Sequence, residues 1–378
     1  MSELYIGLMS GTSLDGVDGV LLELATQAPG AAMPMAVLAH RHRGFDAALA
    51  DELLALNTAG PDELHRAALA GNALARLYAD VVESLLKLSG KSKDQVRAIG
   101  AHGQTVRHRP REFDATGYTL QLGNAALLAE LSGIDVVADL RSRDVAAGGL
   151  GAPLVPAFHR AVFAQARRNI AVLNIGGMAN LTALHADGTT AGFDCGPGNA
   201  LMDHWCRQHT GQPFDDAGTW AASGTVMVPL LTTMLDEPFF RSSPPKSTGR
   251  DLFNTAWLAD HLQRLQSGAA ARPQDVQATL AELTATTCAH AMRQHAGDAN
   301  ELLVCGGGAL NLHLLRRLGA QLQGTNVVTT DTRGLPAMQV EACAFAWLAR
   351  AFCHRECANL PAVTGASGPR VLGALYPA

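Results

Sequence analysis

The spacing of apolar residues predicts alternating strands and helices along the first half of the chain. Runs of apolar and β-branched residues, separated by turn residues, have the character of strands. Other stretches repeat apolar residues every three or four positions, as an amphipathic helix does. The expected strands are 4–9, 17–24, 35–42, 97–103 and 133–141, and the expected helices are 45–57 and 62–88.

The second half repeats this order of elements with almost no shared sequence. Three strands are expected within 168–195, followed by a strand that ends in a triple glycine at 306–308. Helices are expected over 199–209, 275–292 and 338–353, the last apolar on most sides, and 211–250 is expected to be a loop-rich insertion. The sequence therefore predicts two similar α/β domains with a ligand cleft between them. The expected boundaries are 1–167 with 355–378 for one domain, and 168–354 for the other.

Composition and charge narrow the class of protein. The 378 residues are 48% hydrophobic and 17% charged, with a net charge of −5, which is typical of a globular chain. The sequence has no long basic patch, no apolar run of membrane-spanning length and no basic segment before Leu4 that would suggest a signal peptide. We therefore expect neither a nucleic-acid partner nor a membrane. The seven cysteines are scattered without a CxxC pair, which favours reduced thiols and a cytoplasmic location.

Three glycine-rich turns follow predicted strands and are the first candidates for ligand binding. The stretch GTSLDGVD (11–18) lacks the Gly-Lys-Ser/Thr of a Walker A loop, and a strand rather than a Rossmann helix comes next. Glycines let backbone N–H groups converge on a phosphate, and hydroxyls add donors. The turns NIGGMANLT (174–182) and CGGGALN (305–311) have a similar design. Each turn alone is also compatible with an ordinary tight turn, but together they favour a nucleotide held across the cleft.

Carboxylates near these turns suggest a metal ion and a catalytic base. Asp15 and Asp18 would repel a phosphate unless a divalent cation lay between them, which implicates Mg²⁺. Asp194 ends a predicted strand, a good position for a general base, and Asn199 is the better candidate for the cap of the next helix. The alternative for Asp194 is a turn or cap residue.

Other polar residues follow strand ends and suit a polyhydroxylated ligand such as a sugar, although each alone is more often structural. They are His102, Gln104 and His108 in AHGQTVRH, Asp139, Arg141, Arg143 and Asp144 in ADLRSRD, and Lys246, Ser247, Thr248 and Arg250 in PKSTGR.

These motifs together resemble the anhydro-N-acetylmuramic acid kinase family over nearly the whole chain. The supporting motifs are MSGTSLDGVD (9–18), AHGQTV (101–106), GGLGAPLVP (148–156), NIGGMANLT (174–182), FDCGPGN (193–199), PKSTGR (245–250), CGGGALN (305–311), EACAFAWLA (341–349) and GPRVLGALYP (368–377). The resemblance implies two RNase-H-like domains of the sugar kinase, Hsp70 and actin superfamily, closing on ATP. It also implies that ATP, water and 1,6-anhydro-N-acetylmuramic acid give ADP and N-acetylmuramic acid 6-phosphate, in recycling of cell-wall muropeptides.

The resemblance assigns roles to individual residues. It implies that Asp194 takes a proton from the water that attacks the anomeric carbon, and it leaves a homodimer open. The implied ATP-binding residues are Gly11, Thr12, Ser13, Leu14, Asp15, Gly16, Val17, Asp18, Gly176, Gly177, Asn180, Gly306, Gly307 and Gly308, with Mg²⁺ as a cofactor whose ligands the sequence does not identify. The implied substrate-binding residues are His102, Arg141, Arg143 and Glu341. Leu150 replaces a glutamine that the family pattern would favour, and Cys195 replaces a common threonine.

Two hypotheses from other classes are compatible with parts of the sequence. A non-enzymatic nucleotide clamp would use the same glycine turns but would not need the polar set of His102, Arg143, Lys246 and Glu341. A metal-dependent hydrolase would use His102, His108 and Asp194, but their spacing matches no metal motif. A metal site is also compatible with Cys353, His354 and Cys357. A structural role is the better interpretation, because the sequence has no second pair of metal ligands nearby.

Overall fold

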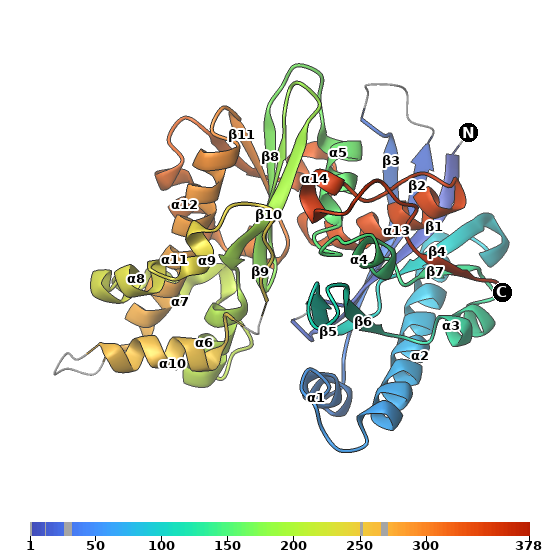
Figure 1. The fold of residues 1–378 in the computed structure, drawn as a ribbon, viewed down its shortest axis with the longest axis horizontal. Coiled ribbons are helices and arrows are strands. Elements are labelled where there is room, and N and C mark those ends of the chain that lie inside the picture. The colour runs from blue at the N-terminus through green and yellow to red at the C-terminus, as the bar shows by residue number, and fades with distance from the viewer. Residues whose placement is uncertain (1, 12, 26–31, 250–251, 266–270) are drawn as a thin grey trace. The chain divides into compact units, whose positions relative to one another are not determined.

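The chain divides into two compact units (Figure 1). The computed structural model describes residues 2–11, 13–25, 32–249, 252–265 and 271–378. Unit 1 consists of Met1–Val162 together with Gln339–Ala378, and unit 2 is the continuous stretch Phe163–Met338. Among the described helices, none combines the length and the apolar character needed to cross a membrane.

The described part of unit 1 is built on a six-stranded sheet with the order β13-β7-β4-β1-β2-β3. Strands β1, β2 and β3 form an antiparallel meander, β4 and β7 continue the sheet in parallel with β1, and β13 closes its edge antiparallel to β7. The strands are β1 Ser2–Met9, β2 Gly16–Ala25, β3 Met35–Gly44, β4 Val96–Ala101, β7 Val136–Ala138 and β13 Ala374–Tyr376.

Two helices cover opposite faces of this sheet, α2 (Glu63–Ser89) and α13 (Val340–Cys353). A side chain at Gly7 would overlap the carbonyl oxygen of Ala342, and one at Gly19 would overlap Val81. Gly7 and Leu8 point to opposite faces because side chains alternate along a strand, and Gly19 pairs with Leu8. Both glycines therefore serve the close approach of a helix to the sheet.

A two-stranded hairpin and several short helices complete unit 1. The hairpin joins β5 (Gln104–Pro110) to β6 (Gly117–Leu122) and is absent from the elements expected from the sequence. The remaining helices are α1 Ala47–Ala55, α3 Ala125–Ser132, α4 Ser142–Ala146, α5 Val155–Phe163, which crosses the unit boundary by one residue, α14 Pro361–Thr364 and the 3₁₀ turn η1 Lys93–Gln95.

Unit 2 has a five-stranded sheet with the order β10-β9-β8-β11-β12. Strands β8, β9 and β10 again form an antiparallel meander, and β11 and β12 continue in parallel with β8. The strands are β8 Ile170–Ile175, β9 Met178–Leu184, β10 Thr190–Pro197, β11 Glu301–Cys305 and β12 Asn326–Thr329. The predicted repeat of architecture is confirmed, since both sheets begin with a three-stranded meander and continue with parallel strands.

Helices make up most of the rest of unit 2. The expected insertion over 211–250 is not simply a loop, because it contains several short helices. The helices are α6 Ala200–Thr210, η2 Asp216–Gly218, α7 Thr219–Ala222, α8 Val228–Leu235, α9 Pro238–Arg241, α10 Thr255–Arg264, α11 Pro273–His295, η3 Gly307–Leu310, α12 Leu312–Gln321, η4 Thr330–Arg333 and η5 Ala337–Gln339, which crosses the unit boundary by one residue.

The unit boundaries differ from the domain boundaries expected from the sequence. Helix α13 falls in unit 1 rather than in the second domain, because its backbone packs directly onto β1 and β4 at Gly7 and Gly100. The apolar pattern predicted a buried helix here, which is confirmed, but not the sheet that buries it.

Candidate functional site

In unit 1, the predicted site residues lie at the carboxyl end of the parallel strands. The turn between β1 and β2 begins with Ser10 and Gly11, and β4 ends beside it, since Leu8 pairs with Ala101. Strand β7 runs parallel to β4, so Asp139 and Arg141 follow at the same end. Carboxyl ends of parallel strands are where ligands bind in α/β sheets.

The segment after β4 holds the first glycine turn in place. Ser10 Oγ donates to the carbonyl oxygen of Gly103 at 3.0 Å and lies 2.9 Å from the Tyr78 hydroxyl. Gln104 Nε2 donates to the Gly11 carbonyl oxygen at 3.0 Å. The sequence singled out both motifs, and the structure shows that the second one fixes the backbone of the first.

His102 and Arg141 form a buried pair at this end of the sheet. Nδ1 of His102 lies 3.1 Å from the Ser10 carbonyl oxygen, so this nitrogen carries the proton and donates it. Its Nε2 accepts hydrogen bonds from Nε and Nη2 of Arg141, at 3.1 and 2.9 Å. Burial, helped by the charge of Arg141, lowers the pKa of His102 to about 3. The imidazole is therefore neutral, and both of its nitrogens are engaged, which argues against a metal-ligand role.

Several residues of the stretch 11–18 serve the packing of unit 1 rather than offering polar groups to a ligand. Val17 is completely buried in the core, so any contact it makes with a ligand is confined to its backbone. A side chain at Gly16 would overlap the Arg43 carbonyl oxygen. Leu14 adopts a left-handed backbone conformation (φ 58°) and packs against the small apolar cluster around Leu53.

The two carboxylates of this stretch already have protein partners. Ser13 Oγ donates to Asp15 at 2.7 Å. Asp18 Oδ1 lies 3.1 Å from His40 Nε2 and 3.2 Å from His42 Nδ1, on the neighbouring strand β3. Thr12, also predicted to bind ATP, lies outside the described residues.

The remaining predicted substrate residues lie on helices of unit 1. Arg143 is exposed on α4, and Glu341 is half-buried in the first turn of α13. Next to Arg143 on α4, the buried Asp144 accepts hydrogen bonds from Gly151 N, Asn359 Nδ2 and Thr364 Oγ1, at 2.7–2.8 Å. Asp144 thus ties the glycine-rich loop after α4 to the C-terminal segment, which is a structural role.

In unit 2, the two predicted glycine turns pack against each other at one end of the sheet. The β8–β9 turn holds Gly176 and Gly177, and Gly306 to Gly308 follow β11, which runs parallel to β8. A side chain at Gly306 would overlap the Asn174 amide, and one at Gly308 would overlap Ile175. These glycines let the second turn lie directly on the first.

A third glycine turn, after β10, completes this group. Gly198 N donates to Gly177 O at 2.9 Å, and Asn199 N donates to Gly176 O at 2.8 Å. Asn199 occupies the N-cap position of α6, as expected, but its side chain donates to Ile175 O at 3.0 Å and makes no capping hydrogen bond. The loops after β8, β10 and β11 therefore form one continuous backbone surface.

Asp194 lies beside these loops on β10, with 7% of its surface exposed. In the register of the sheet, it pairs with Asn180 of β9, which in turn pairs with Asn174 of β8. Its carboxylate oxygen Oδ2 accepts hydrogen bonds from Ser247 Oγ at 2.7 Å and from Thr248 N at 2.9 Å. A buried carboxylate beside three glycine turns can accept a proton close to bound phosphates.

The segment 246–248 contacts Asp194, whereas its sequence suggested polar groups suited to a sugar ligand, with a structural role for each residue left open. Lys246 directs its ammonium group to the carbonyl oxygen of Phe239, at 3.2 Å, and lies 4.7 Å from the centre of the Phe239 ring. Burial lowers its pKa. The sequence carries no signal that Ser247 contacts Asp194, because this contact depends on the path of the chain between β10 and Ser247.

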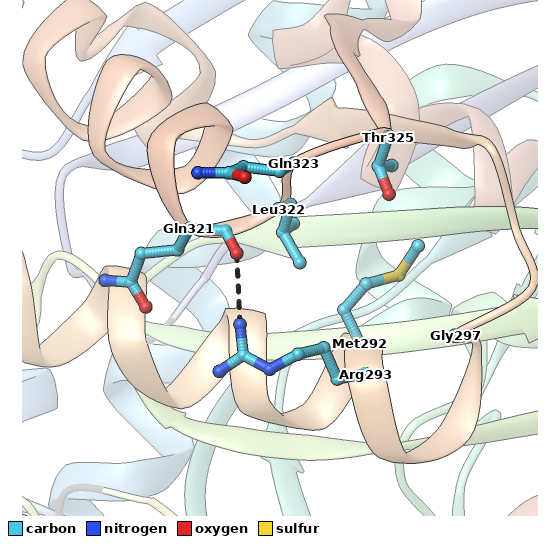
Figure 2. Close-up of a pocket in the computed structure, with 7 residues that line it drawn as sticks. All are labelled: Met292, Arg293, Gly297, Gln321, Leu322, Gln323 and Thr325. Carbon is cyan, nitrogen blue, oxygen red and sulfur yellow. Dashed lines mark hydrogen bonds between the residues drawn. The ribbon is translucent and has the colours of Figure 1, made fainter.

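A surface hollow of about 250 Å³ lies at the other end of the unit 2 sheet (Figure 2). Its lining comes from the ends of α11 and α12 and from the loop into β12. Arg293 in its wall donates to the Gln321 carbonyl oxygen at 3.1 Å. Because β11 and β12 begin at this end, whereas Gly306 follows β11, the hollow is separate from the glycine turns.

The antiparallel meander continued by parallel strands, with glycine-rich turns at their carboxyl ends, defines the class of fold: each unit has an RNase-H-like topology. The family profile described as "Anhydro-N-acetylmuramic acid kinase" matches residues 3–378. The chain belongs to the anhydro-N-acetylmuramic acid kinase family.

Full-length relatives bear the same family name. The anhydro-N-acetylmuramic acid kinase of Variovorax paradoxus is 60% identical, covering 100% of this chain and 99% of its own. That of Albidiferax ferrireducens is 58% identical, with 100% of each chain covered. Among solved structures, the activator of the 2-hydroxyisocaproyl-CoA dehydratase from Clostridium difficile is similar with a TM-score of 0.46 and 13% identity, over 91% of this chain and 92% of that one.

Proposed function

We propose that this protein is an ATP-dependent kinase that opens 1,6-anhydro-N-acetylmuramic acid with water and phosphorylates O6, giving ADP and N-acetylmuramic acid 6-phosphate. Family membership over nearly the whole chain supports this activity. The observation that carries the proposal is the buried carboxylate of Asp194, held next to three packed glycine turns. A general base and a phosphate-binding backbone surface are the two parts that this reaction requires.

In the proposed reaction, Asp194 removes a proton from a water molecule as that water attacks the anomeric carbon. The new bond joins the water oxygen to C1, and the bond between C1 and O6 of the anhydro bridge breaks. O6 keeps the electron pair and attacks the γ-phosphorus of ATP, and ADP leaves. The sugar has no free 6-hydroxyl group before this step, so the base acts on water rather than on the sugar.

The glycine turns of unit 2 fit a nucleotide phosphate chain. Their backbones approach each other too closely for side chains at Gly306 and Gly308, so a ligand at these turns would meet backbone rather than side chains. We assign Gly176, Gly177 and Asn180 to the phosphates and the loop 306–308 to the adenosine. The first turn of unit 1, Gly11 to Asp15, is assigned to the phosphates as well.

Magnesium fits as an ion held mainly by phosphate oxygens and water. Within the described residues, no group of three or more His, Cys, Asp or Glu side chains is placed to hold a metal ion. Mg²⁺ commonly binds through one or two carboxylates together with the substrate phosphates. Asp15 is the better candidate ligand, because Asp18 already contacts two histidines. When bound, Mg²⁺ would neutralise charge on the phosphates.

The substrate residues are assigned from unit 1. Arg141 is fixed in place by His102 and by a hydrogen bond from its Nη1 to Gly151 O at 2.8 Å, so its guanidinium is preorganised. We assign Arg141, Arg143 and Glu341 to contacts with the sugar, and His102 to the support of Arg141. The predicted cleft, homodimer and cytoplasmic location stay predictions.

The decisive experiment incubates purified protein with Mg-ATP and the anhydrosugar in H₂¹⁸O and identifies the product by mass. We expect N-acetylmuramic acid 6-phosphate with one ¹⁸O at C1. Asp194→Asn should retain ATP binding, measured by titration calorimetry, and lose about 10³-fold in kcat, because the base is removed. A variant with near-normal turnover would reject the role of Asp194. ADP release that does not depend on the sugar would instead support a nucleotide clamp.

A further inference from the structure

The segment 246–248 of unit 2 is connected to Asp194 by three hydrogen bonds. Two of them, from Ser247 Oγ and Thr248 N, reach the same carboxylate oxygen. The third runs from Asp194 N to Lys246 O at 3.2 Å. Both the side chain and the backbone of Asp194 are therefore held by three consecutive residues that are distant in the sequence.

Two donors on one oxygen fix the orientation of a carboxylate. The side chain of an aspartate otherwise rotates about two bonds, and the terminal rotation is broad. Hydrogen bonds to an ionised acceptor are short and about twice as strong as neutral ones, and the Ser247 bond has the length expected of them. The plane of the Asp194 carboxylate is set by Ser247 and Thr248 before any substrate arrives.

The segment itself is anchored on its far side. The Lys246 ammonium group donates to the carbonyl oxygens of Phe239 and Phe240, at 3.2 and 3.5 Å, and lies over the Phe239 ring. These carbonyl groups belong to α9, whose residue Phe240 also touches the backbone at Gly196. A half-buried lysine held in this way keeps the segment 246–248 from moving away from β10.

We propose that Ser247 is a positioning residue that orients the catalytic carboxylate of Asp194, an inference that rests on the proposed function. Ser247 acts through Asp194 and not through a contact with the sugar. This is more specific than the sequence-based expectation, in which Lys246, Ser247 and Thr248 belonged to a set of polar residues suited to a sugar ligand. The difference is measurable, because a misdirected base lowers kcat, whereas a lost sugar contact raises KM.

The test compares Ser247→Ala with wild-type full-length protein in the kinase assay. We expect kcat to fall about 10- to 100-fold, because small misplacements of a catalytic group carry costs of this size. The KM values for ATP and the anhydrosugar should change less than about twofold. Ser247→Thr, which keeps the hydroxyl group, should restore kcat to within about threefold of wild type. Ser243→Ala removes an exposed hydroxyl group shortly before this segment and should behave as wild type.

Ser247→Cys serves as a second variant if Ser247→Ala fails to fold, because it preserves size and weakens the donor. It should reduce kcat with the same unchanged KM values. Wild-type kcat in either variant, or a raised KM for the sugar at unchanged kcat, would overturn the positioning role while the proposed function stands. Wild-type protein that does not turn over the anhydrosugar would overturn the proposed function and this role together.

Discussion

The pair of His102 and Arg141 shows how a residue that resembles a catalytic group in the sequence can serve as a support. A buried, neutral imidazole presents one acceptor nitrogen, and the Arg141 guanidinium occupies it with two donors. The other nitrogen is committed to the backbone of the first glycine turn. His102 therefore links the turn to the arginine, and removing it would loosen both.

The lowered pKa of His102 predicts a specific pH dependence of stability. The unfolded chain binds a proton at His102 near pH 6.5, whereas the folded protein does so only near pH 3. The free energy of unfolding should therefore fall as the pH drops below 6.5. By pH 5.5 the loss should reach about 1.4 kcal/mol relative to pH 8 for this residue.

Urea unfolding of wild-type and His102→Gln protein at pH 8 and pH 5.5 measures this effect. The variant should be less stable at pH 8 but should lose about 1.4 kcal/mol less between the two pH values, since glutamine does not titrate. Equal losses in both proteins would show that His102 titrates normally in the folded state.

At the scale of elements, the contact between α13 and the unit 1 sheet depends on two glycines. A side chain at Gly7 would overlap Ala342 O, and one at Gly100 would overlap Phe345 O. The helix therefore lies on the backbone of β1 and β4 rather than on side chains. Glu341, which we assign to the substrate, is in the first turn of this helix. The close contact between helix and sheet therefore also fixes the distance of Glu341 from the sheet.

Gly100→Ala should lower the free energy of unfolding by at least about 1–3 kcal/mol, because the added methyl group has no space and backbone must shift. The matched control is Gly319→Ala in α12, where a methyl group would meet nothing within 4 Å. The control should gain about 0.5–1 kcal/mol, since alanine is the better helix former. Urea titration of both variants distinguishes these signs, and a neutral Gly100→Ala would contradict the close packing.

The sequence predicted strands and helices better than it predicted the contacts between distant side chains. The strands β1 to β3 and β8 to β10 and the helices α2, α11 and α13 lie where their periodicity indicates, because each buries a face whose period is local information. The contact of Ser247 with Asp194 and that of His102 with Arg141 were missed, because they join segments 53 and 39 residues apart. In the hairpin, β5 (QTVRHRP) is rich in arginine and histidine and lacks the apolar alternation that marks a strand, whereas the short alternation of β6 (GYTLQL) could have indicated one.

At the scale of the whole molecule, the two units differ in how the chain builds them. Unit 2 is one continuous stretch, Phe163–Met338, whereas unit 1 is incomplete without Gln339–Ala378. That last segment supplies α13 on the sheet face, β13 at the sheet edge, and the Asn359 and Thr364 partners of the buried Asp144. Unit 1 therefore depends on contacts between the first and last parts of the sequence.

This difference predicts unequal behaviour of fragments. Residues 163–338 expressed alone should unfold cooperatively, because their sheet and helices are all present. Residues 1–162 alone should not, because one face of the sheet and the donors around Asp144 are missing. Thermal unfolding followed by circular dichroism checks both fragments, and a cooperative transition in 1–162 would contradict the role given to the C-terminal segment.

Strand β13 ends at Tyr376, and it pairs with β7, which is made much earlier. On the ribosome, synthesis of unit 1 begins first, but its sheet cannot be completed until Tyr376 has been translated. Unit 2 is translated in full before that point. The usual order, in which N-terminal domains mature before C-terminal ones, is reversed for this chain. During that interval the apolar face that α13 will cover is open to the chaperones that meet nascent proteins.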